Sequence, residues 1–563
     1  MKKNKYSLKK IAKTMVIAVF ALAFVACTGN FEDLNTNPYE VNTADLSIEA
    51  QLIKPLTYVY APHQNMFQFY TNLSVDLFGG YFMTPHNFGG GGNADYKLNQ
   101  GFCGGVYENF YLNIFNTTSS MIPICTEKKL TDYAAVLRIV QAYAAIVATD
   151  SYGPMPFKSV LEKSETLYYD TQKDIYAYLF QDLEKAINEI KQFTASNPSD
   201  ERKAGLAKFD YWCDGDHAKW IKVANTLKLR MAIRLSKVEP ALAQTKAEEA
   251  VAAGVLTNAD TDILINKNLS NELWRMFAWG DCGMNASLVT MLTGYEDPRL
   301  PLFLTKNTGD VTEDTGKKDT DDKPILKVLV PKGTLYVGVR AGCTLPSKPN
   351  AWVNYSGMNV QEHTPLPVMK VAETYFLRAE GALRGWNMDG TEKDLYEEGI
   401  RTAINNDYKY YNPFAADAVK PTDEIITAYI NNTTAKQSDF VDPADATNNH
   451  KAMNTLSVKW DAGASKEEKL QRIITQKWLA NFPISNESWA EFRRTGYPKL
   501  FPVKNNSSNG TIDTDVQIRR LIYSNVEYNT NKAELDKAIT LLGGPDNGGT
   551  KLWWDTNAGA SNF

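Results

Sequence analysis

The chain has 563 residues, of which 44% are hydrophobic and 22% are charged, proportions typical of a globular protein with a sizeable core. Its formal net charge of −5 argues against a nucleic-acid-binding protein, which normally carries a basic patch. Apart from Cys27, the cysteines are far apart and include no Cys-x-x-Cys pair, so neither a disulfide framework nor a zinc site is indicated.

The first predicted element is a secretory signal. Six lysines and no acidic residue occur in residues 1–13, and residues 14–26 are all apolar or small. This apolar run is shorter than the roughly 20 residues that a membrane-spanning helix needs, and the combination is typical of a cleaved signal peptide. The junction Phe24-Val25-Ala26-Cys27 resembles the bacterial lipobox, although Phe24 stands where leucine is usual. We therefore expect residues 1–26 to be a lipoprotein signal peptide and Cys27 to carry the lipid. The alternative is an ordinary secretory signal followed by a chance cysteine.

Helical periodicity dominates the rest of the chain. Apolar residues recur every three or four positions in six segments: 133–148, 173–193, 217–236, 368–384, 394–408 and 466–482. Thr171 followed by Asp174 predicts a capping-box-like start for the second of them. In the third, Lys222 and Arg230 are expected on the solvated face.

The segments between these helices are long and rich in Gly, Asn and Pro, notably 78–105, 266–285 and 305–365. Loops of this length in a compact domain are usually functional or disordered. Strand signals are few and short, such as the one at 327–331. Ala- and Tyr-rich helix pairs joined by short turns suggest stacked helical hairpins of the tetratricopeptide kind. We predict a mostly α fold with a tetratricopeptide-like helical-hairpin scaffold, long loop excursions and few short strands, forming one domain over residues 27–563.

An enzyme is the main alternative, but the sequence contains no recognisable catalytic motif. The five histidines are scattered without an HExxH pattern, and no GxSxG, P-loop or GxGxxG motif occurs. Glu296 and Asp297 could act on a glycosidic bond, but "YEDPRLP" fits a turn in which Arg299 pairs with a neighbouring acid. The acidic segment 309–324 is rich in Asp, which suits calcium, but it lacks the EF-hand pattern of a calcium site. It is expected to be a solvated loop. No catalytic residue, metal or cofactor is assigned.

An ordered series of phrases from Cys27 to the C-terminus resembles one family. The phrases are "NFEDLNTNPYEVN", "AYAAIVATDSYGPMPF", "WIKVANTLKLRMAIR", "YEDPRLPLF", "ETYFLRAEGALRGWN", "IITQKWLANF", "EFRRTGYPKL", "RRLIYSNVEYNTN" and "LWWDTN". Together they are similar to the SusD/RagB nutrient-binding outer-membrane lipoproteins of Bacteroidota, in the second SusD-like subgroup. The residues of these segments are expected to have mainly structural roles. Arg493 and Arg494 can form hydrogen bonds to carboxylates or carbonyls, and Trp553 and Trp554 are expected to close the core.

The resemblance implies a lid-like receptor without enzymatic activity. Such a protein is anchored by lipid to the outer membrane, faces the cell exterior, and delivers an oligosaccharide or oligopeptide to a SusC-like TonB-dependent transporter. A surface-anchored glycosidase-like enzyme and a structural adhesin remain as alternatives.

Three loop windows share the composition that a neutral oligomeric ligand needs. Windows 79–93, 271–285 and 350–359 each place large aromatics beside Asn, Asp or Arg in a Gly-rich setting. Aromatic faces and oriented amides suit the apolar and polar surfaces of such a ligand. The predicted ligand-binding residues are Tyr81, Phe88, Trp274, Trp279, Trp352 and Tyr355, each of which could instead be an ordinary core residue.

Overall fold

The structure is a computed structural model that describes residues 47–84, 92–265, 269–343, 345, 352–556 and 561–563. The chain divides into two compact units, Met1–Gln51 and Leu52–Phe563. In the first unit only residues 47–51 are described, and most of them belong to the start of helix α3 (Ile48–Thr57). The predicted signal peptide and Cys27 therefore lie outside the described residues.

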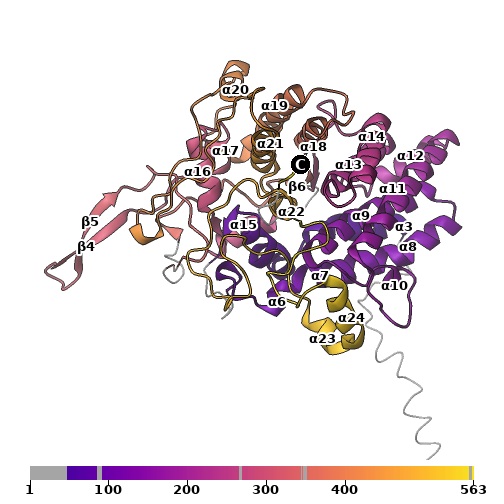
Figure 1. The fold of residues 1–563 in the computed structure, drawn as a ribbon, viewed down its shortest axis with the longest axis horizontal. Helices are drawn as coiled ribbons and strands as arrows, with labels where there is room; N and C mark the ends of the chain where they lie inside the picture. Colours follow the sequence, from indigo (N-terminus) through magenta and orange to yellow (C-terminus); the bar gives the residue numbers. More distant parts are fainter. Residues whose placement is uncertain (1–46, 85–91, 266–268, 344, 346–351, 557–560) are drawn as a thin grey trace, which may run out of the picture. The chain divides into compact units, whose positions relative to one another are not determined.

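A stack of helices forms the scaffold of the second unit (Figure 1). Its members pack on one another largely in chain order: α8 on α9, α9 on α11, α11 on α13, α13 on α14, and then α18 on α19 and α21. The bounds are α8 (Asn116–Glu127), α9 (Thr131–Tyr152), α11 (Gln172–Ala195), α13 (His217–Arg234), α14 (Pro240–Ala253), α18 (Val371–Leu383), α19 (Glu392–Tyr411) and α21 (Lys466–Asn481). The neighbouring pairs α13–α14 and α18–α19 are helical hairpins of the predicted kind, although α14 lies outside the segments whose periodicity predicted a helix.

The central helices show why these segments fold as they do. Helix α9 is long and apolar enough to cross a bilayer, but its apolar window is entirely buried by neighbouring parts of the protein. Helix α11 begins at the predicted cap, where the Thr171 hydroxyl accepts a hydrogen bond from the Asp174 amide at 3.1 Å. One expectation for α13 is wrong: Arg230 is buried, because its guanidinium pairs in bidentate fashion with Glu373 at 2.6 and 2.9 Å.

Shorter helices fill the connections and the C-terminal part. They are α4 (Gln64–Phe67), α5 (Asp76–Phe78), α6 (Gln100–Cys103), α7 (Gly105–Phe110), α10 (Lys158–Leu161), α12 (Asp200–Ala207), α15 (Glu272–Ala278), α16 (Ala286–Gly294), α17 (Leu300–Phe303), α20 (Asp423–Ile430), α22 (Ser485–Thr495), α23 (Asn525–Thr530) and α24 (Lys532–Leu542). A π-helical segment, η3 (Gln68–Val75), joins α4 to α5. Helix α22 ends where Gly496 adopts a left-handed conformation with φ of 79°.

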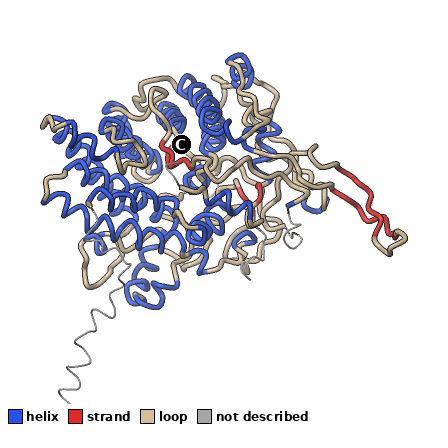
Figure 2. The backbone as a smooth tube through the Cα atoms, turned by 180° about the vertical axis from the view of Figure 1, so that it is seen from behind, coloured by secondary structure: helices blue, strands red, loops and turns tan. Residues whose placement is uncertain are grey.

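The described strands form three antiparallel pairs (Figure 2). They are β1 (Phe82–Met83) with β3 (Gly283–Met284), β2 (Ile263–Ile265) with β6 (Leu366–Met369), and β4 (Val311–Lys318) with β5 (Pro324–Val330). The predicted strand at 327–331 is confirmed over 327–330, which belong to β5. The expectation of a solvated loop over 309–324 is wrong for residues 311–318, because their backbone pairs with β5.

Candidate functional site

The three aromatic windows, which are far apart in the sequence, meet in the structure. Residues of the first and second windows pair as strands β1 and β3, with Phe82 opposite Met284 and Met83 opposite Gly283. The Asn285 amide continues this contact by donating to the Tyr81 carbonyl at 3.0 Å. A short β pair therefore fixes two of the windows side by side.

Trp352 brings the third window to the same place. Its indole Nε1 donates to the Gly280 carbonyl at 2.7 Å. Its six-membered ring lies over Gly283, where a Cβ atom would stand only 2.4 Å from ring atom Cε3. Gly283 is thus needed for the close approach of the ring to the backbone, and Trp352 locks the third window onto the second.

Two tryptophans of the second window lie on helix α15 or directly after it. The N-terminus of α15 is capped by the side chain of Asn271, which accepts from the amides of Leu273 and Trp274. Trp274 is half-buried, and the guanidinium of Arg275 lies 5.6 Å from its ring centroid. The helix ends at Ala278, and the next residue, Trp279, is 40% exposed. Trp279 directly precedes Gly280, so it lies beside the Trp352 contact.

Two of the predicted aromatics lie in the core. The Tyr81 side chain is fully buried against Trp478, and its hydroxyl donates to the Trp478 carbonyl and contacts the Ser488 hydroxyl at 2.5 Å. Tyr355 is 4% exposed, with its hydroxyl 3.1 Å from a carboxylate oxygen of Asp442. Burial raises the pKa of both phenols well above the usual value. Neither offers a ring face to a ligand in this structure, and Phe88 lies outside the described residues.

Residues beyond the windows also support the site. The Gln68 amide in η3 donates to a carboxylate oxygen of Asp281 at 2.7 Å and braces the turn after α15. Phe277 meets Phe82 edge-to-face with ring centroids 6.1 Å apart. Gln68 and Asp281 are 213 positions apart, and no local sequence pattern pairs them. Phe277 could have been singled out, because it lies in the same aromatic window.

A cavity among the described residues lies away from the three windows. Its volume is about 600 Å³, it opens beside the end of α22, and none of its lining residues belongs to the three windows. Among those residues, Glu467 already accepts hydrogen bonds from the Tyr497 hydroxyl at 3.1 Å and the Asn562 amide at 2.5 Å. We therefore base the candidate site on the aromatic windows, which bring together the ring faces and polar groups that the sequence singled out.

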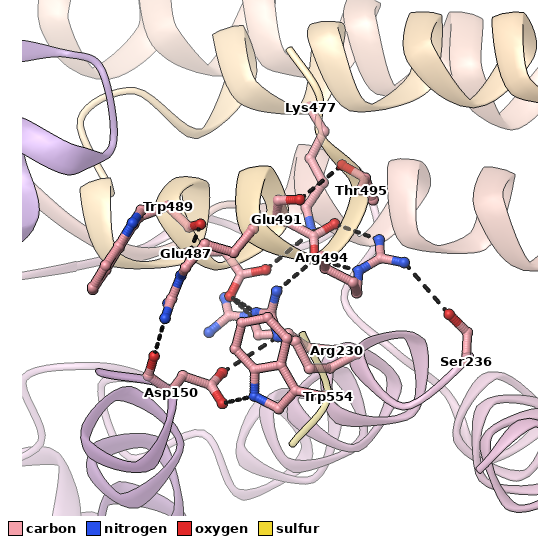
Figure 3. Close-up of polar contacts among 12 residues, drawn as sticks. Asp150, Arg230, Ser236, Lys477, Glu487, Trp489, Glu491, Arg494, Thr495 and Trp554 are labelled. Atoms are coloured by element: carbon pink, nitrogen blue, oxygen red, sulfur yellow. Dashed lines mark hydrogen bonds and ion pairs between the residues drawn. The ribbon is translucent and has the colours of Figure 1, made fainter. Parts of the chain in front are cut away.

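A buried ionic network links charged side chains of α13, α21 and α22 (Figure 3). In it Arg234 contacts Glu487 and Glu491 at 2.6 Å each, and Lys477 lies 3.1 and 3.2 Å from the same two carboxylates. Arg494 pairs with Glu380 and Glu491 at 2.6 and 2.7 Å.

The pKa values of this network indicate a structural role. Burial by itself raises the pKa of Glu491, but the charges of Arg494, Lys477 and Arg234 outweigh it and hold that pKa well below its usual range. Such a carboxylate stays ionised and paired with its neighbouring cations, so it is poorly suited to act as a general acid. Among the described residues, no three His, Cys, Asp or Glu side chains are grouped so as to hold a metal ion.

The structural predictions for Arg493, Arg494 and Trp554 are confirmed, whereas Trp553, which was also expected in the core, is only half-buried. Arg493 donates to the carbonyls of Asp150 and Arg519 at 2.6 and 2.9 Å. Trp554 is fully buried, and its Nε1 donates to Asp150 at 2.7 Å. Arg299 forms the expected pair with its neighbour Asp297, at 2.6 Å.

Comparison with known proteins identifies the family. The model of the SusD-like family, described as "Susd and RagB outer membrane lipoprotein", matches residues 30–555. A search of curated protein sequences gave no match.

Solved structures agree with this assignment. A chitin-binding SusD homologue from Flavobacterium johnsoniae is 32% identical, with a TM-score of 0.79 over 92% of this chain and 100% of that one. A SusD-like protein from Bacteroides thetaiotaomicron is also 32% identical, with a TM-score of 0.78 over 90% of this chain and 99% of that one. A further structure, described only as a chitin-binding protein, is 26% identical, with a TM-score of 0.71 over 91% of this chain and all of that one. The fold and the match over nearly the whole sequence show that the chain belongs to the SusD-like family of outer-membrane lipoproteins.

Proposed function

We propose that this protein captures a glycan oligomer at the cell surface through the aromatic site formed by Trp279, Trp352 and Trp274, and delivers it to a SusC-like TonB-dependent transporter. The observation that carries the proposal is the convergence of three distant windows around these tryptophans. Family membership supports a nutrient-binding role at the outer membrane.

The three tryptophans differ in what they can offer a ligand. Trp279 is the most exposed of them, at the end of α15, and can present a ring face for stacking. The indole N–H of Trp352 already donates to the Gly280 carbonyl. Trp352 can therefore offer a ligand only the edge or the outer face of its ring. Trp274 has the Arg275 guanidinium near its ring, and that group can donate hydrogen bonds to hydroxyl or amide oxygens.

A glycan is favoured over an oligopeptide on two grounds. Sugar rings present flat apolar faces that stack on aromatic side chains, and hydroxyls that accept and donate hydrogen bonds. Two similar structures are described as chitin-binding proteins. Chito-oligosaccharides are therefore the first ligands to test, with cello-oligosaccharides and neutral oligopeptides as comparisons.

Calorimetry on the full mature protein tests the stacking role. We expect Trp279→Ala to weaken glycan binding by about 1–3 kcal/mol, taking base–aromatic stacking as the guide, while the melting temperature stays close to that of the unaltered protein. Tyr168→Ala is a matched control, because Tyr168 is 37% exposed and lies between α10 and α11. Unchanged affinity in the Trp279 variant, or equal losses in both variants, would contradict the proposed site.

The same samples separate the alternatives. Mass spectrometry of the oligosaccharide after prolonged incubation should show unchanged chain length, whereas shorter products would favour a glycosidase-like enzyme. Recovery of a barrel protein with the tagged lipoprotein from solubilised outer membranes would distinguish a transport receptor from a free-standing adhesin.

A further inference from the structure

The hairpin formed by β4 and β5 extends away from the other elements of the second unit, as the opposed views of Figures 1 and 2 agree. Its strands are antiparallel, with Glu313 opposite Lys327 and Asp314 opposite Leu326. The Asp319 carboxylate closes the turn by accepting from the amides of Asp321 and Lys323, each at 2.9 Å. The hairpin thus has defined internal bonding and packs mainly on itself.

Strand β5 exposes apolar side chains on both faces, and Lys327 is its one charged residue. Alternation along a strand puts Leu326 and Val328 on one face and Ile325 and Leu329 on the other. These four residues are 51%, 47%, 43% and 47% exposed, respectively. A strand that is apolar on both faces normally lies inside a sheet or between layers. Strand β4 has a different composition: it carries Glu313, Asp314, Lys317 and Lys318, and all of it beyond Val311 is exposed.

One edge of β5 has no strand against it. In the described part of the chain, β5 pairs with β4 alone. A long, exposed, apolar edge is a template for pairing with another chain, and proteins normally shorten, charge or cover such edges. An isolated two-stranded hairpin is also marginally stable in water. The open apolar edge and the marginal stability of the hairpin both indicate that another segment covers β5.

We propose that the β4–β5 hairpin is a docking arm, in which an extended apolar segment of the outer-membrane transporter covers β5 and pairs with its open edge. This rests on the proposed function, because that function supplies a protein partner at the same membrane. The covering segment has a definable chemistry. It is apolar, adds a strand to the hairpin, and carries an acidic residue that faces Lys327.

The charges of the hairpin argue against the two other occupants. Lys327 is the central residue of β5, so symmetric antiparallel pairing with a second copy would set Lys327 against Lys327, which is destabilising. A membrane surface attracts polybasic segments, but the four lysines of the hairpin are outnumbered by its acids Glu313, Asp314, Asp319, Asp321 and Asp322. A protein strand is the occupant that fits both the apolar faces and the single central lysine.

The test uses the full-length lipoprotein, tagged and expressed in its source organism. In the arm variant, Leu326→Thr is combined with Val328→Thr, because threonine keeps the β propensity and removes much of the apolar surface. In the control variant, Glu313→Thr is combined with Lys317→Thr on the polar strand of the same hairpin. Protein is purified from detergent-solubilised outer membranes, and the barrel recovered with it is quantified by mass spectrometry.

We expect the arm variant to recover at least tenfold less barrel than the control, with unchanged melting temperature and glycan affinity. Equal recovery by both variants would overturn the docking arm and leave the proposed function standing. Recovery of no barrel by the unaltered protein would contradict the proposed transporter partnership itself. Dimers seen by light scattering and lost in the arm variant would assign β5 to a second copy. Loss of binding to anionic lipid vesicles with barrel recovery intact would assign it to a membrane.

Discussion

Gly283 shows how one residue can position an aromatic side chain of the candidate site. The Trp352 ring lies over its backbone and is tied to Gly280 by one hydrogen bond of 2.7 Å. A neutral hydrogen bond contributes about 0.5–1.5 kcal/mol to stability. A Cβ atom at residue 283 would stand 2.4 Å from the ring, closer than real contacts allow, so the ring or the strand must move.

We therefore predict that Gly283→Ala displaces Trp352 and lowers glycan affinity. Overpacking of this kind costs about 1–3 kcal/mol of stability, so the melting temperature should also fall. Gly463→Ala is the control, because the nearest atom to its added Cβ would be at an ordinary 3.5 Å. Calorimetry and melting curves on both variants check this. An unmoved Trp352 in a crystal structure of the Gly283 variant, with full affinity, would refute it.

At the residue scale, composition could select the windows but could not separate surface from core. Tyr81 and Trp279 occupy similar Gly- and aromatic-rich contexts, yet one is fully buried and the other 40% exposed. The difference comes from Trp478, which lies 397 positions from Tyr81 and supplies its hydrogen-bond acceptor. Such a long-range partner leaves no signal in the local sequence.

At the scale of elements, apolar stripes predicted the scaffold helices α9, α11, α13, α18, α19 and α21, because a stripe must be buried wherever the helix packs. They did not predict α8 or α14. Buried charge was harder to predict. Arg230 is expected in solvent from its position in α13, but Glu373 of α18 neutralises it in the core. The polar composition of the β4 segment fits an exposed strand as well as a loop. It forms a strand because its backbone pairs with β5.

The ionic network gives a prediction for helix α22. Arg494→Met removes the cation that pairs with Glu380 and Glu491 while keeping a side chain of comparable length. Removing one partner of a buried ion pair typically costs about 3–5 kcal/mol, since a buried charge loses its compensation. We expect a loss of unfolding free energy in that range, measured by denaturant titration.

A surface pair provides the control for Arg494. Lys532 and Asp536 are 2.7 Å apart but more than half exposed, and exposed pairs contribute at most about 1 kcal/mol. Lys532→Met should therefore leave stability nearly unchanged. Equal effects of the two substitutions would mean that the network does not hold the helices together.

At the scale of the whole molecule, the candidate site depends on chain topology. Strands β1 and β3 are two residues long each and bring together windows about 200 positions apart. Outside α15, the windows lie in connections between helices, and the helices fix the ends of these connections. Windows without helical periodicity can therefore lie side by side. Sequence composition suggested that the windows act together, but their meeting point could be found only in the structure.

We predict that lipid on Cys27 attaches the molecule to the outer membrane. The basic leader and the Phe24–Cys27 junction point to lipid on Cys27, and each buried CH₂ of an acyl chain adds about 0.8 kcal/mol to membrane binding. Cys27→Ala should abolish labelling by a fatty-acid analogue and release the protein from the outer-membrane fraction. Thr28→Ala, at the neighbouring position, should retain both. Because Cys27 precedes the region matched by the family model, residues 30–555, the released protein should keep its melting temperature and glycan affinity. A Cys27 variant that is still labelled and still sediments with the outer membrane would show that the anchor lies elsewhere.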